Sequence, residues 1–192
     1  MKRWIRDEVQ ELADRLVSQL ERWQLEQNRG PLALLRRGLS EGTQQDAWPV
    51  LGRLFGELAV GHPVFETIAG CFALYPFEKA PAIGNFGETT RRTMPDEKMR
   101  DEKEPHTRFR RLLACDDQEA ICQHVPHVVR LAKSSKDAPV NYRQLFLDLW
   151  WWNDRTKVEW AKAYWQVPAE PAGFSLAGLG TPIEEEPAPM PE

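Results

Sequence analysis

The sequence predicts an all-α fold: a two-lobed helical bundle followed by a disordered C-terminal tail. Apolar residues recur at helical spacing in one segment after another of residues 1–166, and alternation typical of strands is almost absent. Proline and glycine separate these segments where helices are expected to end. No unit of about 20 to 50 residues repeats along the chain, so the pattern argues against a solenoid.

A long amphipathic helix is predicted over residues 5–23. Its polar face carries Glu, Asp, Arg and Gln, and its other face is apolar at helical spacing. The apolar positions are Ile5, Val9, Leu12, Leu16, Leu20 and Trp23.

The segment Arg29–Leu39 predicts a short helix with a basic outer side. Pro31 suits the first helical turn, and Gly38 suits a helix end. Arg36 and Arg37 face solvent in this arrangement, because the core-facing positions are Leu32, Leu35 and Leu39. Two interpretations are open: a solvated arginine pair, or part of a surface that holds an anion.

Two apolar-rich helices are predicted next, over residues 48–58 and 64–74, on either side of the turn Gly61-His62-Pro63. Residues 77–105 are loop-like and charged, with one helical turn expected at 85–92. This loop is the predicted joint between a first lobe, about residues 1–76, and a second lobe, about residues 106–166.

The second lobe begins with two predicted helices. Phe109, Leu112 and Leu113 mark a short one, whose other positions are arginines. Residues 117–133 follow with helical spacing, but Pro126 lies inside them, so a kink or break is expected there.

Two more helices complete the second lobe. Asn141, with Gln144 three residues later, resembles a capping box that starts a helix through the tryptophans at 150–152. Asp154 is the expected cap of the last helix. That helix has one apolar stripe formed by Val158, Ala161 and Trp165.

Charge divides the chain into a body and a tail. The net charge of −4 includes residues 167–192, which hold five Glu and no Lys or Arg. Residues 1–166 therefore carry 25 basic and 24 acidic residues, a net charge of +1. Six of the fifteen prolines also lie in the tail, so the sequence predicts a disordered, acidic, Pro-rich segment. A near-neutral body still binds a polyanion if its arginines gather on one face.

Composition also indicates the compartment. Cys71, Cys115 and Cys122 are odd in number and form no CxxC pair, which argues against a disulfide framework and suits a reducing compartment. No run of about 18 apolar residues occurs, and Met1 is followed by a charged amphipathic segment. We expect a cytoplasmic protein with no membrane contact.

Signatures of catalysis are absent from the sequence. Cys122, His124 and His127, with Cys115 upstream, are possible metal ligands by residue type. Pro126 interrupts them and no second ligand pair accompanies them, so the favoured interpretation is a core cysteine. No GxSxG, phosphate-binding glycine loop, HExxH or dinucleotide fingerprint occurs. We expect no catalytic residue, no metal and no cofactor.

Tryptophan is concentrated near the end of the body, at positions 150–152, 160 and 165. Three consecutive side chains on a helix cannot all face one core, so at least one is expected to be partly exposed. One interpretation is a base-stacking platform beside Arg155. The other, which is the commoner case, is a tryptophan-rich core or a subunit interface.

Four motifs occur in order along the chain. They are Arg29-Gly30 through Arg36-Arg37-Gly38; Cys71-Phe72-Ala73-Leu74-Tyr75-Pro76; Asn85-Phe86-Gly87; and Arg108–Leu113 followed by Leu145–Trp152 and Trp160-Ala161. In order and spacing they resemble the CasB family, the small subunits of the type I-E CRISPR interference complex, Cascade. The resemblance covers roughly residues 5–165.

The resemblance implies an all-helical, non-catalytic subunit. Its implied partners are the backbone and large subunits, a second copy of itself, crRNA and target DNA. It would stabilise the R-loop by sequence-independent contacts to the displaced strand and to the crRNA–target heteroduplex. The basic positions that match the family are Arg36, Arg37, Arg108, Arg130 and Arg155. Charge and spacing add Arg29, Arg111, Lys133 and Lys157.

Two other functions are compatible with these residues. A helical protein–protein adaptor would use the same arginines and tryptophans to bind acidic partners. A small metal-dependent nuclease or hydrolase would use the Cys/His cluster. Salt-dependent binding to bare oligonucleotides separates the first from the subunit hypothesis, and zinc content tests the second.

Overall fold

The computed structural model describes residues 4–40, 42–76, 84–94, 106–135 and 138–167. Every regular element in these ranges is helical, which confirms the all-α prediction. The predicted tail, apart from Val167, and most of the predicted joint lie outside the described residues.

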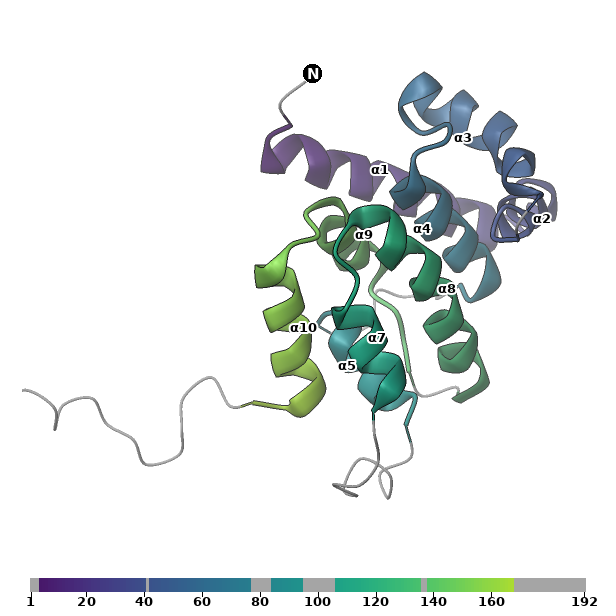
Figure 1. Ribbon diagram of the computed structural model, residues 1–192. Helices are drawn as coiled ribbons and strands as arrows, with labels where there is room; N and C mark the ends of the chain where they lie inside the picture. Colours follow the sequence, from purple (N-terminus) through teal and green to yellow (C-terminus); the bar gives the residue numbers. More distant parts are fainter. Residues whose placement is uncertain (1–3, 41, 77–83, 95–105, 136–137, 168–192) are drawn as a thin grey trace, which may run out of the picture.

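Nine α-helices lie within the described residues (Figure 1). They are α1 (Arg6–Leu25), α2 (Arg29–Arg37), α3 (Trp48–Phe55), α4 (Pro63–Leu74), α5 (Phe86–Arg92), α7 (Thr107–Leu113), α8 (Gln118–Ser135), α9 (Tyr142–Trp150) and α10 (Asp154–Trp165). The 3₁₀ helices η1 (Gln44–Ala47) and η2 (Gly56–Leu58) flank α3. The helix expected over 48–58 ends early because Gly56 adopts a φ of +64°.

Helix α4 lies at the centre of the bundle, in contact with α1, α2, α8 and α9 (Figure 1). Nine of its twelve residues are buried, as expected of a helix that is apolar on all sides. Tyr142 of α9 directs its hydroxyl to the carbonyl oxygens of Cys71, at 3.0 Å, and Tyr75, at 2.7 Å. The end of α4 is thereby tied to the start of α9.

Helix α2 packs closely on α4 through a glycine. A Cβ added at Gly70 would lie 3.0 Å from the Leu35 carbonyl oxygen and would meet the Leu39 side chain. Leu32 and Leu35 are buried, as the spacing predicts. Gly38 ends α2 in a right-handed conformation, so its role is steric: an added Cβ would lie 2.8 Å from the Ala47 Cβ.

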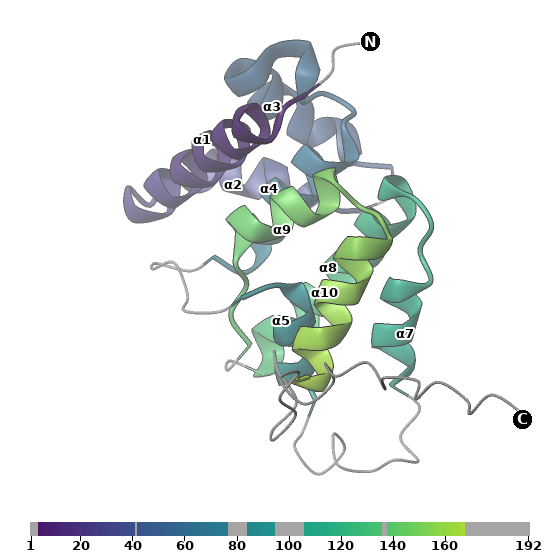
Figure 2. The same ribbon diagram turned by 90° about the vertical axis from the view of Figure 1, so that its left-hand side faces the viewer.

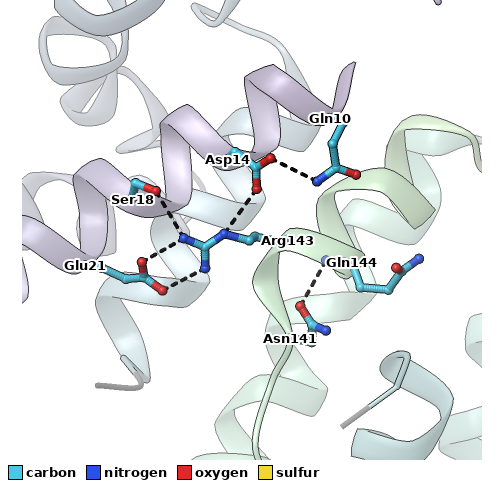
Figure 3. A network of polar contacts seen from close by, with 7 residues as sticks. All are labelled: Gln10, Asp14, Ser18, Glu21, Asn141, Arg143 and Gln144. Carbon is cyan, nitrogen blue, oxygen red and sulfur yellow. Dashed lines mark hydrogen bonds and ion pairs between the residues drawn. The ribbon is translucent and has the colours of Figure 1, made fainter. Parts of the chain in front are cut away.

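An ion-pair network joins α1 to α9 (Figure 3). The guanidinium of Arg143 donates two hydrogen bonds of 2.8 Å to the Glu21 carboxylate and one of 3.1 Å to the Ser18 hydroxyl. Its Nε lies 3.2 Å from the Asp14 carboxylate. The hydrogen bond that Arg143 donates to Glu21 raises the pKa of Arg143, although partial burial opposes the rise. This network orients α1 across α9.

Helix α8 continues through Pro126, so of the predicted kink or break, the break does not occur. Proline has no N–H to donate to the carbonyl of Cys122, four residues earlier. The Thr67 hydroxyl of α4 donates a hydrogen bond of 3.4 Å to that carbonyl instead. The tertiary contact therefore replaces a helical hydrogen bond inside a buried interface.

Helix α5 packs directly on α10 (Figure 2). Asn85 caps α5, because its Oδ1 accepts from the Gly87 N–H at 3.0 Å, and its Nδ2 donates to the Glu159 carbonyl at 3.0 Å. A Cβ added at Gly87 would lie 2.8 Å from the Cα of Trp160 and closer still to its carbonyl oxygen. The helical turn predicted at 85–92 is confirmed, and it is the element that holds α10.

The predicted cap of α9 is confirmed, since Asn141 Oδ1 accepts from the Gln144 N–H at 3.1 Å. The predicted cap of α10 is wrong by one residue: Asn153 Oδ1 accepts from the N–H groups of residues 155 and 156. Trp160 and Tyr164 are the fully buried residues of α10. In the predicted apolar stripe, Val158 is 50% exposed and Trp165 is 45% exposed.

Buried residues from both predicted lobes belong to one hydrophobic cluster. Helices α1 and α4, from the first range, pack against α8 and α9, from the second. Whether residues 1–76 and 106–166 behave as separate folding units stays a prediction.

Candidate nucleic-acid interface

The nine predicted site residues lie on four helices. Eight are exposed, and Lys157 is half-buried. Helix α2 carries Arg29, Arg36 and Arg37; α7 carries Arg108 and Arg111; α8 carries Arg130 and Lys133; α10 carries Arg155 and Lys157.

The two arginines at the end of α2 already have partners. Arg36 donates from Nε to the carbonyl oxygen of Ala73 at 3.0 Å, near the end of α4. Arg37 lies 2.8 Å from the Asp46 carboxylate, with 65% of its side chain exposed. Because exposed ion pairs contribute only about 0–1 kcal/mol, this contact leaves Arg37 free to exchange Asp46 for a phosphate.

Arg130 lies in a hollow of about 540 Å³ between α8 and the end of α2. Gly38–Ser40, directly after Arg37, lines the same hollow, together with His124 and His127 of α8. Glu66 and Glu119 also contribute to the lining, so the hollow has mixed charge. The structure thus brings Arg130 close to the segment that follows the α2 arginines.

The arginines of α7 face outward because the opposite side of this helix is anchored. Phe109 stacks on Tyr164 of α10, with ring centroids 3.8 Å apart and planes inclined by 6°. His106, which precedes α7, lies with Nδ1 2.7 Å from the Tyr164 hydroxyl. Arg108 and Arg111 are both exposed, on a helix that is held against α10 (Figure 2).

Lys157 is the most neutralised of the nine. Its Nζ lies 3.7 Å from carboxylate oxygens of both Asp116 and Asp154, and 5.9 Å from the ring centroid of Trp152. Of the nine predicted residues, Lys157 is therefore the least available to contact a phosphate.

Arg155 lines a second hollow, of about 580 Å³, with Trp151 and Arg6. Arg29 lines a third, of about 270 Å³, beside the end of α1. Arg29, Arg130 and Arg155 therefore occupy three different hollows. Sequence reasoning missed Arg6, because nothing local links the start of α1 to residues near position 155.

Four of the five tryptophans near the end of α9 and in α10 have clearly different environments. Trp150 stacks on His62, with centroids 4.8 Å apart, and Trp152 donates from Nε1 to the Cys115 carbonyl at 2.9 Å. Trp160 is buried and donates to Asp148 at 2.6 Å. Trp151 is 39% exposed, which confirms the prediction that at least one would be.

The Cys/His cluster does not converge. Cys122 is buried beside Thr67, and burial raises the pKa of its thiol to about 12. The ring centroids of His124 and His127 are 6.5 Å apart. Across the described part of the chain, no three His, Cys, Asp or Glu side chains are arranged to hold a metal ion.

Comparison with known proteins gives the family. A model of the family described as CRISPR-associated protein Cse2 matches residues 31–165, well over half of the chain. The chain belongs to the Cse2 family. The resemblance to the CasB family is thereby confirmed. No match was found among curated proteins or among solved structures.

Membership of the Cse2 family makes the chain a subunit of the CRISPR Cascade complex. The matched range includes every predicted basic residue except Arg29, and it excludes α1 with Arg6. Among the described helices, none has the length and apolar character needed to cross a membrane.

Proposed function

We propose that this Cse2-family subunit stabilises the R-loop without catalysis, through sequence-independent contacts to the displaced DNA strand and the crRNA–target heteroduplex. The observation that carries the proposal is the exposure of Arg36, Arg37, Arg108, Arg130 and Arg155 on helices of the family-matched region. Each of these arginines lies on a helix whose opposite side packs against the rest of the bundle.

The stability of an R-loop depends on a small free-energy difference. Formation of an R-loop exchanges one duplex for another of similar stability, so modest contacts to the displaced strand tip the balance. Arginine suits this task because its planar guanidinium makes forked contacts with phosphate and stays charged. Such contacts read no base, so guide pairing alone sets the sequence.

The distribution of the arginines fits more than one stretch of nucleic acid. Arg37 and Arg130 belong to the α2–α8 side of the molecule, and Arg155 lines a hollow at the α9–α10 corner with Arg6. Two separate regions with exposed arginines are what a subunit needs if it contacts both the heteroduplex and the displaced strand.

The proposed protein partners are those that the family resemblance implies: the backbone and large Cascade subunits and a second copy of this chain. Val158, 50% exposed, and Trp165, 45% exposed, present apolar surface on α10 that supports a protein contact. The same surface favours the second candidate function, a protein–protein adaptor with acidic partners.

R-loop lifetime in the reconstituted complex tests the proposal. Alanine at all five arginines should shorten the lifetime on a matched target and leave the pattern of tolerated mismatches unchanged. Each lost contact to a single strand should reduce the slope of log K against log salt by roughly 0.7. Arg22 and Arg53, exposed arginines on α1 and α3, provide matched control substitutions.

Two results would contradict the proposed function. Unchanged R-loop lifetime with the five-fold variant would favour the adaptor. A changed mismatch pattern at constant matched lifetime would contradict a holding role. Because Arg36 also donates to the Ala73 carbonyl, thermal unfolding of its single variant separates lost folding from lost binding.

A further inference from the structure

One exposed tryptophan and two arginines line the same hollow at the corner of α1, α9 and α10. Trp151, Arg155 and Arg6 line this space of about 580 Å³, within the usual range of about 300–1,000 Å³ for small-ligand sites. Trp151 is 39% exposed, and both arginines are exposed. Residues 6 and 151 are brought together only by the tertiary fold.

The backbone around Trp151 is held in place. Its carbonyl oxygen accepts from Asn153 Nδ2 at 2.6 Å and from the Thr156 hydroxyl at 3.1 Å. Its N–H donates to the Leu147 carbonyl at 3.0 Å, which closes α9. Because Trp150 and Trp152 are engaged on other sides, Trp151 is the tryptophan of this run that is left at the surface.

Two carboxylates also line the hollow, and both have partners. Asp148 accepts from Trp160 Nε1 at 2.6 Å and from Gln144 Nε2 at 2.7 Å. Glu159 pairs with the Lys162 ammonium at 2.9 Å. Beside these two hydrogen-bonded acidic residues, the cationic side chains that line the hollow are Arg6 and Arg155, and these would contact an anionic ligand.

An aromatic face beside arginines is the combination by which proteins hold single-stranded nucleic acid: the ring stacks on a base and the guanidinium groups contact the backbone. A base that is paired within a duplex is stacked on both faces, whereas every base of the displaced strand is unpaired. The displaced DNA strand is therefore the source that fits.

We propose that this hollow holds one unpaired base of the displaced strand, stacked on Trp151, with the adjoining phosphates contacted by Arg6 and Arg155. The inference rests on the proposed function and deepens it, since the subunit then contacts bases as well as phosphates. Stacking accepts any base, so the contact adds no sequence preference.

Photocrosslinking in the assembled Cascade complex tests the placement. 5-Iodouracil is scanned along the displaced strand, and separately along the target strand as a control. Trypsin releases residues 144–155 as one peptide, because no Lys or Arg lies between Arg143 and Arg155. A crosslink at Trp151 from a narrow window of the displaced strand is expected, and its absence, or a crosslink from the target strand instead, would overturn the inference.

Variants test the energetic contribution. Trp151→Ala should shorten R-loop lifetime about 5- to 150-fold, the range of one lost base–aromatic stack, and Trp151→Phe should retain most of the lifetime. Trp48→Ala, at a comparably exposed tryptophan of α3, is the control and should change the R-loop lifetime little. The effect of Trp151→Ala should vanish when the contacted nucleotide is abasic, since the stacking partner is already gone.

The outcomes separate this inference from the proposed function. An equal effect of Trp151→Ala on normal and abasic strands would mean a structural role and overturn the stacking contact. No effect of Trp151→Ala, with the five-fold arginine variant still impaired, would reject stacking and leave R-loop holding intact. An unchanged R-loop lifetime with both variants would reject both the stacking contact and the proposed function.

Discussion

Thr67 of α4 donates its hydroxyl hydrogen bond to the carbonyl oxygen of Cys122 in α8, where Pro126 provides no helical N–H. Thr67 is 6% exposed and Cys122 is 4% exposed, so water has little access to this carbonyl. A continuous α8 therefore depends on its packing against α4.

Replacing this hydroxyl should destabilise the fold. Thr67→Val keeps the shape but leaves the Cys122 carbonyl without its donor, and we expect a loss of about 1–2 kcal/mol in the free energy of unfolding. Pro126→Ala restores the backbone N–H. In that background Thr67→Val should cost clearly less, and equal costs in the two backgrounds, measured by denaturant unfolding, would contradict the coupling.

The contact between α5 and α10 predicts intolerance at Gly87. An alanine there would drive its Cβ into the Trp160 backbone, so the helices must separate, and the expected loss is about 1–3 kcal/mol or more. Gly30 is the matched control, at the second position of α2 with open space around it. Thermal unfolding of Gly30→Ala should match or slightly exceed that of the unmodified chain.

The Arg143 network predicts a measurable contribution to the docking of α1. Arg143→Ala removes several charge-assisted hydrogen bonds at a partly buried site, and a loss of about 1–2 kcal/mol is expected. Arg92→Ala breaks only an i,i+4 pair with Glu88, so its cost should be about 0.3–0.5 kcal/mol. Equal losses for the two variants in urea unfolding would mean that the network does not hold α1.

Asp148 predicts a pH dependence of stability. Burial raises the pKa of its carboxyl, and the hydrogen bonds from Trp160 and Gln144 oppose the rise. Because the folded state binds this proton more readily than the unfolded state, the carboxyl favours folding most at low pH. That advantage is lost as pH rises through the folded-state pKa. Compared with Asp148→Asn, the native chain should gain stability as pH falls from about 7 toward about 4.

The acidic tail predicts weaker binding to nucleic acid than the body alone would show. Ending the chain after Val167, whose N–H donates to the Lys162 carbonyl at 2.9 Å, removes five glutamates and no basic residue. The net charge rises from −4 to +1, so oligonucleotide affinity should stay equal or increase, most clearly at low salt. Weaker binding after truncation would mean that the tail itself contributes to the contact.

Much of the helix pattern could be predicted from sequence because its signals are local. The spacing of Leu32 and Leu35 and the cap at Asn141 depend on residues within one or two turns, and the structure confirms them. The outward direction of Arg108 and Arg111 follows from the same periodicity, once Phe109 and Leu112 are buried. The family resemblance was also visible in the order of the motifs, and the match over residues 31–165 confirms it.

The tertiary structure alone decided matters that join distant residues. The local sequence predicts a kink or break at Pro126. Thr67, 55 residues away from Cys122, supplies the hydrogen-bond donor that the proline lacks. Similarly, Gly87 is an ordinary helical residue until the Trp160 backbone lies against it. The direction of each tryptophan at 150–152 depends on the residues that pack against it. Arg6 and Trp151 line the same hollow only because α1 packs against α9. Periodicity records which face of a helix is buried, whereas the partner on that face is set by the packing of the whole chain.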